Sequence, residues 1–494
     1  MNYYDKLPLP VIIVSEEKGT EGEGQCDCAC PSPSISQSYI KNALSEDALL
    51  MKNPLLRVIP IDANFSTLFI PSSNSISVVN NSTFELLESL KSPKTYSEAT
   101  LCWQGVWGDE LTQSINKLID LGFLIEPGGE LLTKPLENPE KLIIWLHVTN
   151  DCNLLCHYCY LQKTKESMDL NVGREAIDAI FRSAIIHNFQ SVKIKYAGGE
   201  PSLNFSLIVS LHKYASQLAE LYNLKLDGVI LSNGVGLTSR MLESMLNHKL
   251  RLMISLDGIG ESHDRQRMFI NGAGSFDAVN RTVRRALLLG LIPDISITVT
   301  ERNVDTLPTT IDWVLKHNLP FSINLYRENS ISATFNDLQF SEEKIIQGMK
   351  SVFKVIERNL PSRSLLPSLI DRSNLAIPHT QTCGVGSNYM VIDHYGNISK
   401  CQMQITKPVT TVKSEDPLVF IRSDQIGIQN LNVDQKEECR NCEWRYWCAG
   451  GCPLSTHRTT GRYNVKSPNC SIYKNLYPEA VRLEGLRLLS LYAK

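Results

Sequence analysis

The sequence predicts an α/β protein centred on a partial (β/α)6 barrel of the TIM-like type, between a small winged-helix-like domain and a cysteine-rich domain. Six apolar, strand-like runs recur between residues 141 and 327, and segments with helical spacing separate them. Apolar strands that alternate with helices form parallel βαβ units in which both faces of the sheet are covered. Because such crossovers are right-handed, six consecutive units curl into a partial barrel.

Each predicted strand runs into polar or glycine residues at its carboxyl end. In chain order the strands lie within KLIIWLHVT, SVKIKYAGG, LDGVILSNG, LRLMISLDG, PDISITVT and FSINLYR. A closed eight-stranded barrel would need two more such runs, and the sequence gives no sign of them. Barrels of this kind hold ligands at the carboxyl ends of their strands, so we expect the functional site among these polar residues.

Composition and pattern divide the chain into five segments. Residues 1–50 are expected to be a flexible tail, because 15–38 are rich in Gly, Ser, Glu and Pro. Residues 51–137 contain strand-like runs (LLRVIPI, STLFIP, SISVV) and two helical runs (NSTFELLESL, DELTQSINKLIDLGFLIE), which predict the winged-helix-like domain. The barrel takes 138–330, a helical bridge 331–382, and the cysteine-rich domain 383–494.

The bulk properties favour a cytoplasmic protein that binds neither nucleic acid nor membranes. The 494 residues carry a formal net charge of −3, which is unsuited to phosphate or anionic lipid. No apolar run approaches the roughly 20 residues that span a bilayer, and the first residues lack the basic region of a signal peptide. Fourteen cysteines without a secretory signal indicate metal ligation or redox chemistry rather than disulfides.

Three cysteines follow the first barrel strand in HVTNDCNLLCHYCYL, residues 147–161. Cys152, Cys156 and Cys159 have the spacing C-x3-C-x2-C and supply three thiolates, whereas a closed zinc or iron-sulfur site uses four ligands. One interpretation is a structural zinc site completed by His147 or His157. The other is a cluster whose fourth position stays open.

The second interpretation is favoured because this stretch, with Tyr158 before the last cysteine, resembles the cluster-binding loop of radical S-adenosylmethionine (SAM) enzymes. The resemblance implies a [4Fe-4S] cluster held by the three cysteines, with SAM on the fourth iron. One electron from the reduced cluster then cleaves SAM and gives a 5′-deoxyadenosyl radical. It also implies a reducing partner such as flavodoxin or ferredoxin.

Further strand-end residues fit the same family. The GGEP stretch after the second strand resembles the motif that receives the SAM amino group. The polar groups after the third and fourth strands would face the ribose and methionine of SAM, or could simply cap the following helices. Arg267 would pair with the SAM carboxylate or brace its loop. The predicted SAM-binding residues are Tyr158, Gly198, Gly199, Glu200, Pro201, Ser232, Asn233, Ser255, Asp257 and Arg267.

Seven cysteines in the last domain resemble the motif of the SPASM extension found in radical SAM peptide and protein maturases. The resemblance implies two auxiliary [4Fe-4S] clusters, and hence three clusters in all. The outer one would use Cys439, Cys442, Cys448 and Cys470, and the inner one Cys383, Cys401 and Cys452. The competing interpretation is a zinc ribbon of Cys439, Cys442, Cys448 and Cys452.

The inner ligand set departs from some relatives. Tyr389 stands where they supply a fourth inner ligand, so this position is open or is filled from elsewhere, for example by Cys102 or by the tail thiols Cys26, Cys28 and Cys30. The tail thiols could equally be an incidental patch. Gln402 stands where sulfatase maturases of the family have an aspartate base, which weighs against formylglycine formation.

The segment 51–137 resembles, in pattern, the PqqD-like peptide-recognition element fused to many maturases of ribosomal peptides. Such elements bind a leader segment as an added strand. DNA binding is disfavoured because acidic residues outnumber basic ones here, and a purely structural cap stays open. The sequence thus predicts a radical SAM maturase that cross-links a ribosomally synthesised precursor peptide through C–C or C–S bonds. The alternatives are maturation of a folded protein (a sulfatase or a quinone-cofactor subunit) and a non-catalytic iron-sulfur or zinc scaffold that binds peptides.

Overall fold

A computed structural model describes residues 8–14, 35–38, 47–71, 73, 76–101, 103, 107–128, 132–135 and 139–493. Most of the predicted tail, including Cys26, Cys28 and Cys30, lies outside the described residues, as does Cys102. Among the helices described, none is long and apolar enough to cross a membrane.

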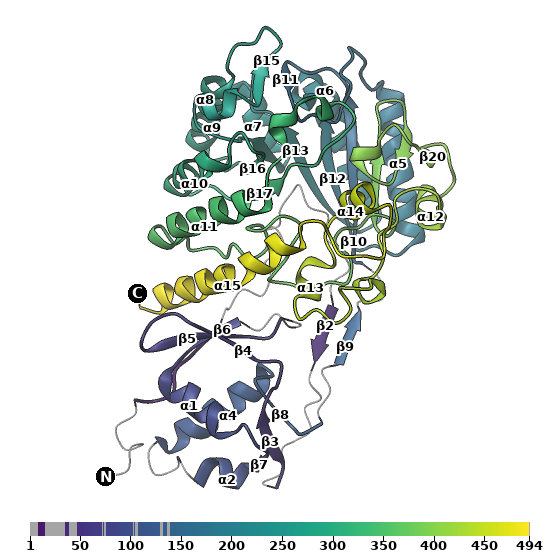
Figure 1. Ribbon diagram of the computed structural model, residues 1–494. Coiled ribbons are helices and arrows are strands. Elements are labelled where there is room, and N and C mark those ends of the chain that lie inside the picture. The colour runs from purple at the N-terminus through teal and green to yellow at the C-terminus, as the bar shows by residue number, and fades with distance from the viewer. Residues whose placement is uncertain are drawn as a thin grey trace.

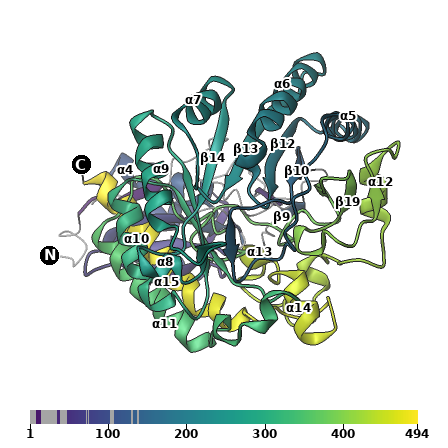
Figure 2. The ribbon, with the colours of Figure 1, turned by 90° about the horizontal axis from the view of Figure 1, so that it is seen from above.

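The central sheet confirms the predicted α/β fold class. Six parallel strands stand side by side in chain order: β10 (Lys141–Thr149), β12 (Ser191–Gly198), β13 (Lys225–Ser232), β14 (Leu250–Ser255), β16 (Asp294–Val299) and β17 (Phe321–Leu325). The helices that connect or follow them are α5 (Leu170–Ile186), α6 (Phe205–Leu221), α7 (Ser239–Asn247), α9 (Phe276–Leu288), α10 (Leu307–Lys316) and α11 (Glu342–Arg358). Seen from above, these helices surround a curved, open sheet (Figure 2).

Alternate residues of β10 serve two different cores. Leu142, Ile144 and Leu146 join the large core that packs against the helices. Ile143 and Trp145 belong to a second cluster, which also contains cysteines of the last domain. This alternation follows from the two-residue repeat of a strand, and it gives the barrel an inner wall distinct from its helix-covered outer wall.

The sheet continues past the barrel into the cysteine-rich domain. β18 (Tyr389–Ile392) pairs in parallel with β10, and β19 (Asn397–Ser399) and β20 (Thr410–Thr411) follow it antiparallel. The pairing begins at Ile143, whose N–H donates to Asn388 O (2.9 Å), while Asn388 Nδ2 donates to Lys141 O (2.8 Å). The sequence does not show that this hairpin extends the barrel sheet, because pairing between such distant segments leaves no local pattern.

The other elements of the two larger domains are short, apart from the last helix. They are β11 (Leu154–Cys156), β15 (Arg267–Phe269), α8 (Glu261–Asp264), α12 (Pro417–Ser423), α13 (Arg445–Cys448), α14 (Pro453–Thr460) and α15 (Cys470–Tyr492).

The N-terminal module consists of two small sheets and three described helices. One sheet has the order β1 (Ile12–Val14), β6 (Ile76–Asn80), β5 (Phe65–Phe69), β4 (Arg57–Pro60), and the other has the order β7 (Lys94–Thr95), β3 (Leu49–Lys52), β8 (Leu124–Ile125). The helices are α1 (Asn81–Ser89), α2 (Tyr96–Leu101) and α4 (Asp109–Asp120), and β2 (Ile35–Ser38) pairs with β9 (Leu132–Pro135). Helices beside a small sheet agree with the predicted winged-helix-like pattern.

The module packs against the cysteine-rich domain through the last helix. In Figure 1, α15 runs between α11 and the sheet of the module, and it contacts every strand of that sheet. Phe69 of β5 stacks on Trp444 and Trp447 with ring centroids 5.8 and 5.7 Å apart. Gly485 of α15 lies so close to the sheet that a Cβ there would stand 1.9 Å from Thr67 Oγ1.

A Gly485→Ala substitution therefore tests this contact. The methyl group cannot fit without displacing the module, so we expect the free energy of unfolding to fall by about 1–3 kcal/mol, as for other overpacked sites. Ser471→Ala, an exposed site on the same helix, is the matched control and should change little. Chemical denaturation measures both, and a Gly485→Ala protein as stable as the control would contradict the packing described.

Candidate functional site

The three-cysteine loop is held by a short sheet beyond β10. β11 pairs antiparallel with β15, which places Cys156 opposite Arg267. His157 N donates to Gln266 O (3.2 Å) and Cys159 N donates to Cys156 O (3.1 Å). Burial raises the pKa of the Cys156 thiol to about 11, against the opposing effect of the Arg267 and Lys163 cations. The loop thus gathers three thiols beside a buried guanidinium.

The paired glycines after β12 allow the strand end to touch this loop. Gly198 has φ +146°, and a Cβ there would stand 2.1 Å from Thr149 O; at Gly199 it would stand 2.2 Å from Asp151 O. Gly199 N donates to Thr149 O (2.9 Å) and Glu200 N donates to Asp151 O (2.7 Å). No side chain larger than hydrogen fits between the two backbones. In this structure, the two glycines therefore allow the residues that precede Cys152 to lie directly against the end of β12.

The Glu200 carboxylate connects the end of the third strand, β13, to the cysteine loop through hydrogen bonds. It is fully buried and accepts hydrogen bonds from Ser202 N (3.1 Å), Ser232 Oγ (2.8 Å) and Asn233 N (2.7 Å). Burial raises its pKa, which these donors oppose. Asn233 Nδ2 in turn donates to Asn153 Oδ1 (2.7 Å) and lies 3.9 Å from Cys152 Sγ. Pro201 begins the short 3-10 turn that follows Glu200.

Tyr158, Asp257 and Arg267 form a buried polar cluster behind the loop. Tyr158 Oη donates to Asp257 Oδ2 (2.5 Å), and Thr298 N donates to Asp257 Oδ1 (2.8 Å). Arg267 donates to Tyr158 Oη and lies 3.6 Å from Asp257. In this structure Asp257 and Arg267 therefore brace the loop, while Ser255, at the end of β14, stays partly exposed.

Neither histidine of the zinc interpretation is arranged with the three cysteines. His147 lies within β10, and burial lowers its pKa to about 3. His157 stacks on Phe335 (4.3 Å between ring centroids) and contacts Arg302.

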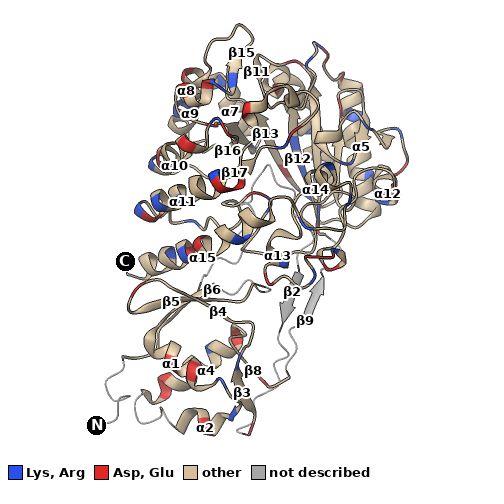
Figure 3. Cartoon of the chain, viewed as in Figure 1, with Lys and Arg blue, Asp and Glu red and all other residues tan. Residues whose placement is uncertain are grey.

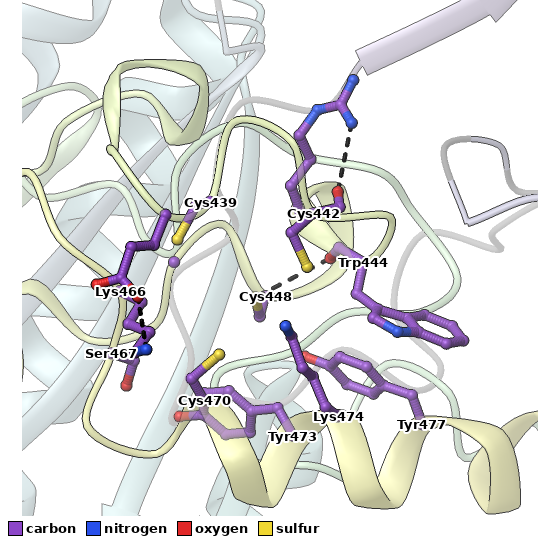
Figure 4. Close-up of a pocket in the computed structure, with 13 residues that line it drawn as sticks. Cys439, Cys442, Trp444, Cys448, Lys466, Ser467, Cys470, Tyr473, Lys474 and Tyr477 are labelled. Carbon is purple, nitrogen blue, oxygen red and sulfur yellow. Dashed lines mark hydrogen bonds and ion pairs between the residues drawn. The ribbon is translucent and has the colours of Figure 1, made fainter.

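Four of the seven C-terminal cysteines line one cavity. Cys439, Cys442, Cys448 and Cys470 line this cavity together, and part of it opens to solvent. Figure 4 shows their sulfur atoms directed toward this common space, with Lys474 reaching in from α15. In the described part of the chain, no three His, Cys, Asp or Glu side chains are arranged to hold a single metal ion. A four-iron cluster is larger than one ion, and the cavity and its thiols fit such a group.

The remaining three cysteines lie against the inner wall of the barrel. Cys383 and Cys401 are buried in one apolar cluster with Ile143 and Trp145. Burial by itself raises the pKa of Cys452, but Arg327 and Arg372 bring it down to about 7.

Tyr389 and Gln402 are hydrogen-bonded to each other beside these cysteines. Tyr389 Oη donates to Gln402 Oε1 (2.9 Å), and Cys401 Sγ lies 3.7 Å from the same oxygen. The tyrosine is fully buried in β18.

The segment 448–452, which we call the linking segment, carries one cysteine of each group. Ala449, Gly450 and Gly451 all have positive φ (45°, 78° and 70°). Thr382 Oγ1 donates to Gly451 O (2.7 Å), and Lys436 Nζ donates to Ala449 O (2.9 Å). Lys436 is only 1% exposed, and a Cβ on Gly450 would stand 2.6 Å from its Nζ. A buried ammonium therefore lies against the segment that joins the two cysteine groups.

Sequence reasoning missed two groups at this site. Tyr160 lies near both Cys159 and Cys401, and burial raises its pKa well above the usual value. Lys436 stands three residues before Cys439, where nothing in the sequence distinguishes a buried lysine from a solvated one. Their roles arise from tertiary placement alone.

Residues 146–314 match the family model described as the Radical SAM superfamily. This region includes the three-cysteine loop and all the strand-end motifs described above. Residues 146–314, the central part of the chain, are therefore similar to radical SAM domains.

Two curated proteins are similar to part of the chain. Radical SAM cyclopropyl synthase TigE of Paramaledivibacter caminithermalis is 23% identical over 245 residues, which cover 44% of this chain and 51% of TigE. The antilisterial bacteriocin subtilosin biosynthesis protein AlbA of Bacillus subtilis is 22% identical over 281 residues, which cover 54% of this chain and 56% of AlbA. The chain thus spans about half the length of these relatives.

The fold is shared with a solved structure, native anSMEcpe with bound AdoMet and Cp18Cys peptide. The TM-score is 0.56 at 17% sequence identity, and the match covers 70% of this chain and 99% of that one. At this level of identity the likeness concerns the fold.

The backbone contact at Gly199 predicts a specific defect. In Gly199→Ala, the added methyl group would push residues 150–151 away and disturb the loop that begins at Cys152. We expect the iron content after anaerobic reconstitution to fall by about four per chain, the content of one [4Fe-4S] cluster. The control is Gly290→Ala, after α9 and outside the β11–β15 sheet, where φ is +81° and a Cβ meets nothing within 4 Å. Equal iron in both variants would rule out this role of Gly199.

Proposed function

We propose that the protein is a radical SAM peptide maturase that cross-links residues of a ribosomally synthesised precursor peptide, forming C–C or C–S bonds. The observation that supports the proposal is that the three-cysteine loop and the inner C-terminal cysteine group lie at different ends of one barrel. Cys152, Cys156 and Cys159 follow the carboxyl end of β10, whereas Cys383 precedes β18, which pairs with β10 from its amino end. The proposal is supported by AlbA, which is named as a bacteriocin biosynthesis protein, and by TigE, which is named as a radical SAM cyclopropyl synthase. The anSMEcpe structure contains a bound peptide.

The residues that would hold the cofactors are those that the family resemblance implies. A SAM-binding [4Fe-4S] cluster would be held by the three-cysteine loop, an outer auxiliary cluster by the four-cysteine cavity, and an inner one by Cys383, Cys401 and Cys452. When bound, the first cluster supplies the electron that turns SAM into methionine and a 5′-deoxyadenosyl radical. Gly198, Gly199, Glu200, Asn233 and the Tyr158 cluster keep its loop in place.

Two auxiliary groups suit an oxidative cross-link. The deoxyadenosyl radical takes one hydrogen atom from the peptide, the resulting carbon radical bonds to a second side chain, and that side chain releases a proton. One electron is left over and needs an acceptor. The inner cysteine group lies against the inner wall of the barrel, where such an acceptor would be needed, and the peptide loses two hydrogens in total.

The alternatives have weaker support. Gln402, hydrogen-bonded to Tyr389, stands where a sulfatase maturase would need a carboxylate base. A non-catalytic scaffold would not explain why residues 146–314 match the Radical SAM family model. Nucleic-acid binding is disfavoured because α1 and α4 of the N-terminal module carry acidic side chains (Figure 3).

Deoxyadenosine formation tests the radical step. Reconstituted protein with SAM and a reductant should release 5′-deoxyadenosine, and Cys156→Ala should release none, because two thiolates do not retain the cluster. About twelve irons per chain, with matching sulfide, are expected for three clusters. About four irons with one zinc would contradict the auxiliary clusters, and with them the proposed electron acceptor. Mass spectrometry of a peptide library after turnover should detect the loss of two hydrogens.

The buried ammonium of Lys436 predicts a redox effect. Lys436→Met removes one positive charge beside the linking segment, and we expect the auxiliary clusters to become harder to reduce by on the order of 50 mV. Lys316→Met is the matched control, because Lys316 is exposed, paired with Asp312 and outside the lining of the cysteine cavity, so solvent screens its charge. Redox titration followed by electron paramagnetic resonance measures both potentials. Unchanged potentials in Lys436→Met would contradict the role of this charge.

A further inference from the structure

The outer edge of the N-terminal sheet is occupied by a short segment of the same chain. β1 pairs antiparallel with β6, with Ile12 opposite Val79, Ile13 opposite Val78 and Val14 opposite Ser77. β6 is otherwise the last strand on this side of the sheet. Edge strands expose unpaired N–H and C=O groups, which makes them sites for the addition of an extended peptide.

Side chains of the module grip the backbone of this segment. Asn80 Nδ2 donates to Leu9 O (2.8 Å), while Asn80 Oδ1 accepts from Val11 N (3.1 Å). Thr83 Oγ1 donates to Val11 O (3.1 Å), and Lys117 Nζ of α4 donates to Ile12 O (2.8 Å). All four bonds go to main-chain atoms of the segment, so the same groups would hold a different extended sequence equally well.

The side chains of this segment are less buried than those of the neighbouring strand. Residues 10–14 are partly exposed, in contrast to the fully buried Val78 and Val79 beside them. Ile12 packs against the core of the module, and β1 also touches α15. The edge thus selects an extended segment with one apolar, β-branched side chain facing the module.

Strand addition of a leader segment is what the resemblance to peptide-recognition elements already implies for this module. We propose that residues 8–14 occupy this edge of β6 as an intramolecular competitor until the precursor peptide displaces them. The proposal rests on the proposed function and deepens it, because it names how the recognition edge is regulated. The partner is an extended apolar peptide segment. A tethered competitor acts at an effective concentration on the order of 1 mM, so its removal should strengthen peptide binding.

The test uses a fluorescent synthetic peptide of unrelated extended sequence that keeps a β-branched apolar residue at the position of Ile12, and a peptide with the sequence of residues 6–16, KLPLPVIIVSE, serves as the reference. A variant lacking residues 1–14 should bind this probe, and the full chain should bind it at least about tenfold more weakly, because the tethered segment competes. Fluorescence anisotropy measures both affinities. A probe with Asp in place of the residue equivalent to Ile12 should lose binding, because the carboxylate would enter an apolar contact.

A matched pair of substitutions locates the site. In the shortened protein, Lys117→Met removes one bond to the added backbone and should weaken the probe several-fold. Lys91→Met, a lysine of the same module that pairs with Glu88, should not. Asn80 is less suitable, because it also caps α1 by accepting from Thr83 N.

A second variant provides the same test in case the shortened protein does not fold. Val11→Pro in the full chain removes the N–H that donates to Asn80 and should also expose the edge to the probe. If either folded variant fails to bind the probe, the proposal is overturned and β1 is a structural strand. The assay needs neither clusters nor turnover, so its failure is distinguishable from failure of the radical chemistry, which the iron count and deoxyadenosine report.

Discussion

The parallel pairing of β10 with β18 is the contact on which the arrangement of the site depends. It makes the cysteine-rich domain a continuation of the barrel sheet. Because the strands run the same way, the residues before β18 lie at the amino end of β10, and the three-cysteine loop lies beyond its carboxyl end. Without this pairing, Cys383 and Cys401 would have no fixed relation to Cys152, Cys156 and Cys159.

Between these ends the inner wall carries an unusual set of side chains. Tyr160 lies near both Cys159 and Cys401, and its ring meets that of His147 edge-on at 6.3 Å. Lys195 Nζ lies 5.7 Å from the centroid of the Trp145 ring. In the proposed enzyme, this aromatic wall and the buried Lys195 would both position a peptide side chain and exclude water from it.

Much of this could be predicted from the sequence, for identifiable reasons. The six strands were predictable because each is an apolar run between helical segments, and the motifs at their ends were predictable because parallel strands gather their carboxyl ends. Gly198 and Gly199 were predicted as SAM-binding residues, and the structure adds a close approach of two backbones at this place. The partner of that approach, residues 149–151, was not predictable, because it depends on a fold of the loop that no local pattern encodes. The same holds for β18, Lys436 and β1, whose partners are all distant in sequence.

The distribution of buried cations gives the cysteine groups different electrostatic surroundings. Arg267 faces Cys156, Arg327 and Arg372 face Cys452, and Lys436 lies against the linking segment. Anionic groups in a buried site need such compensation, and more of it makes the acceptance of an electron easier. The inner group has two guanidinium ions beside Cys452, whereas Lys436 interacts first with Cys439 and Cys448 of the outer cavity, which Lys474 also reaches. In the proposed maturase, the inner group, which lies against the inner wall of the barrel, would be the first acceptor for an electron that leaves the peptide.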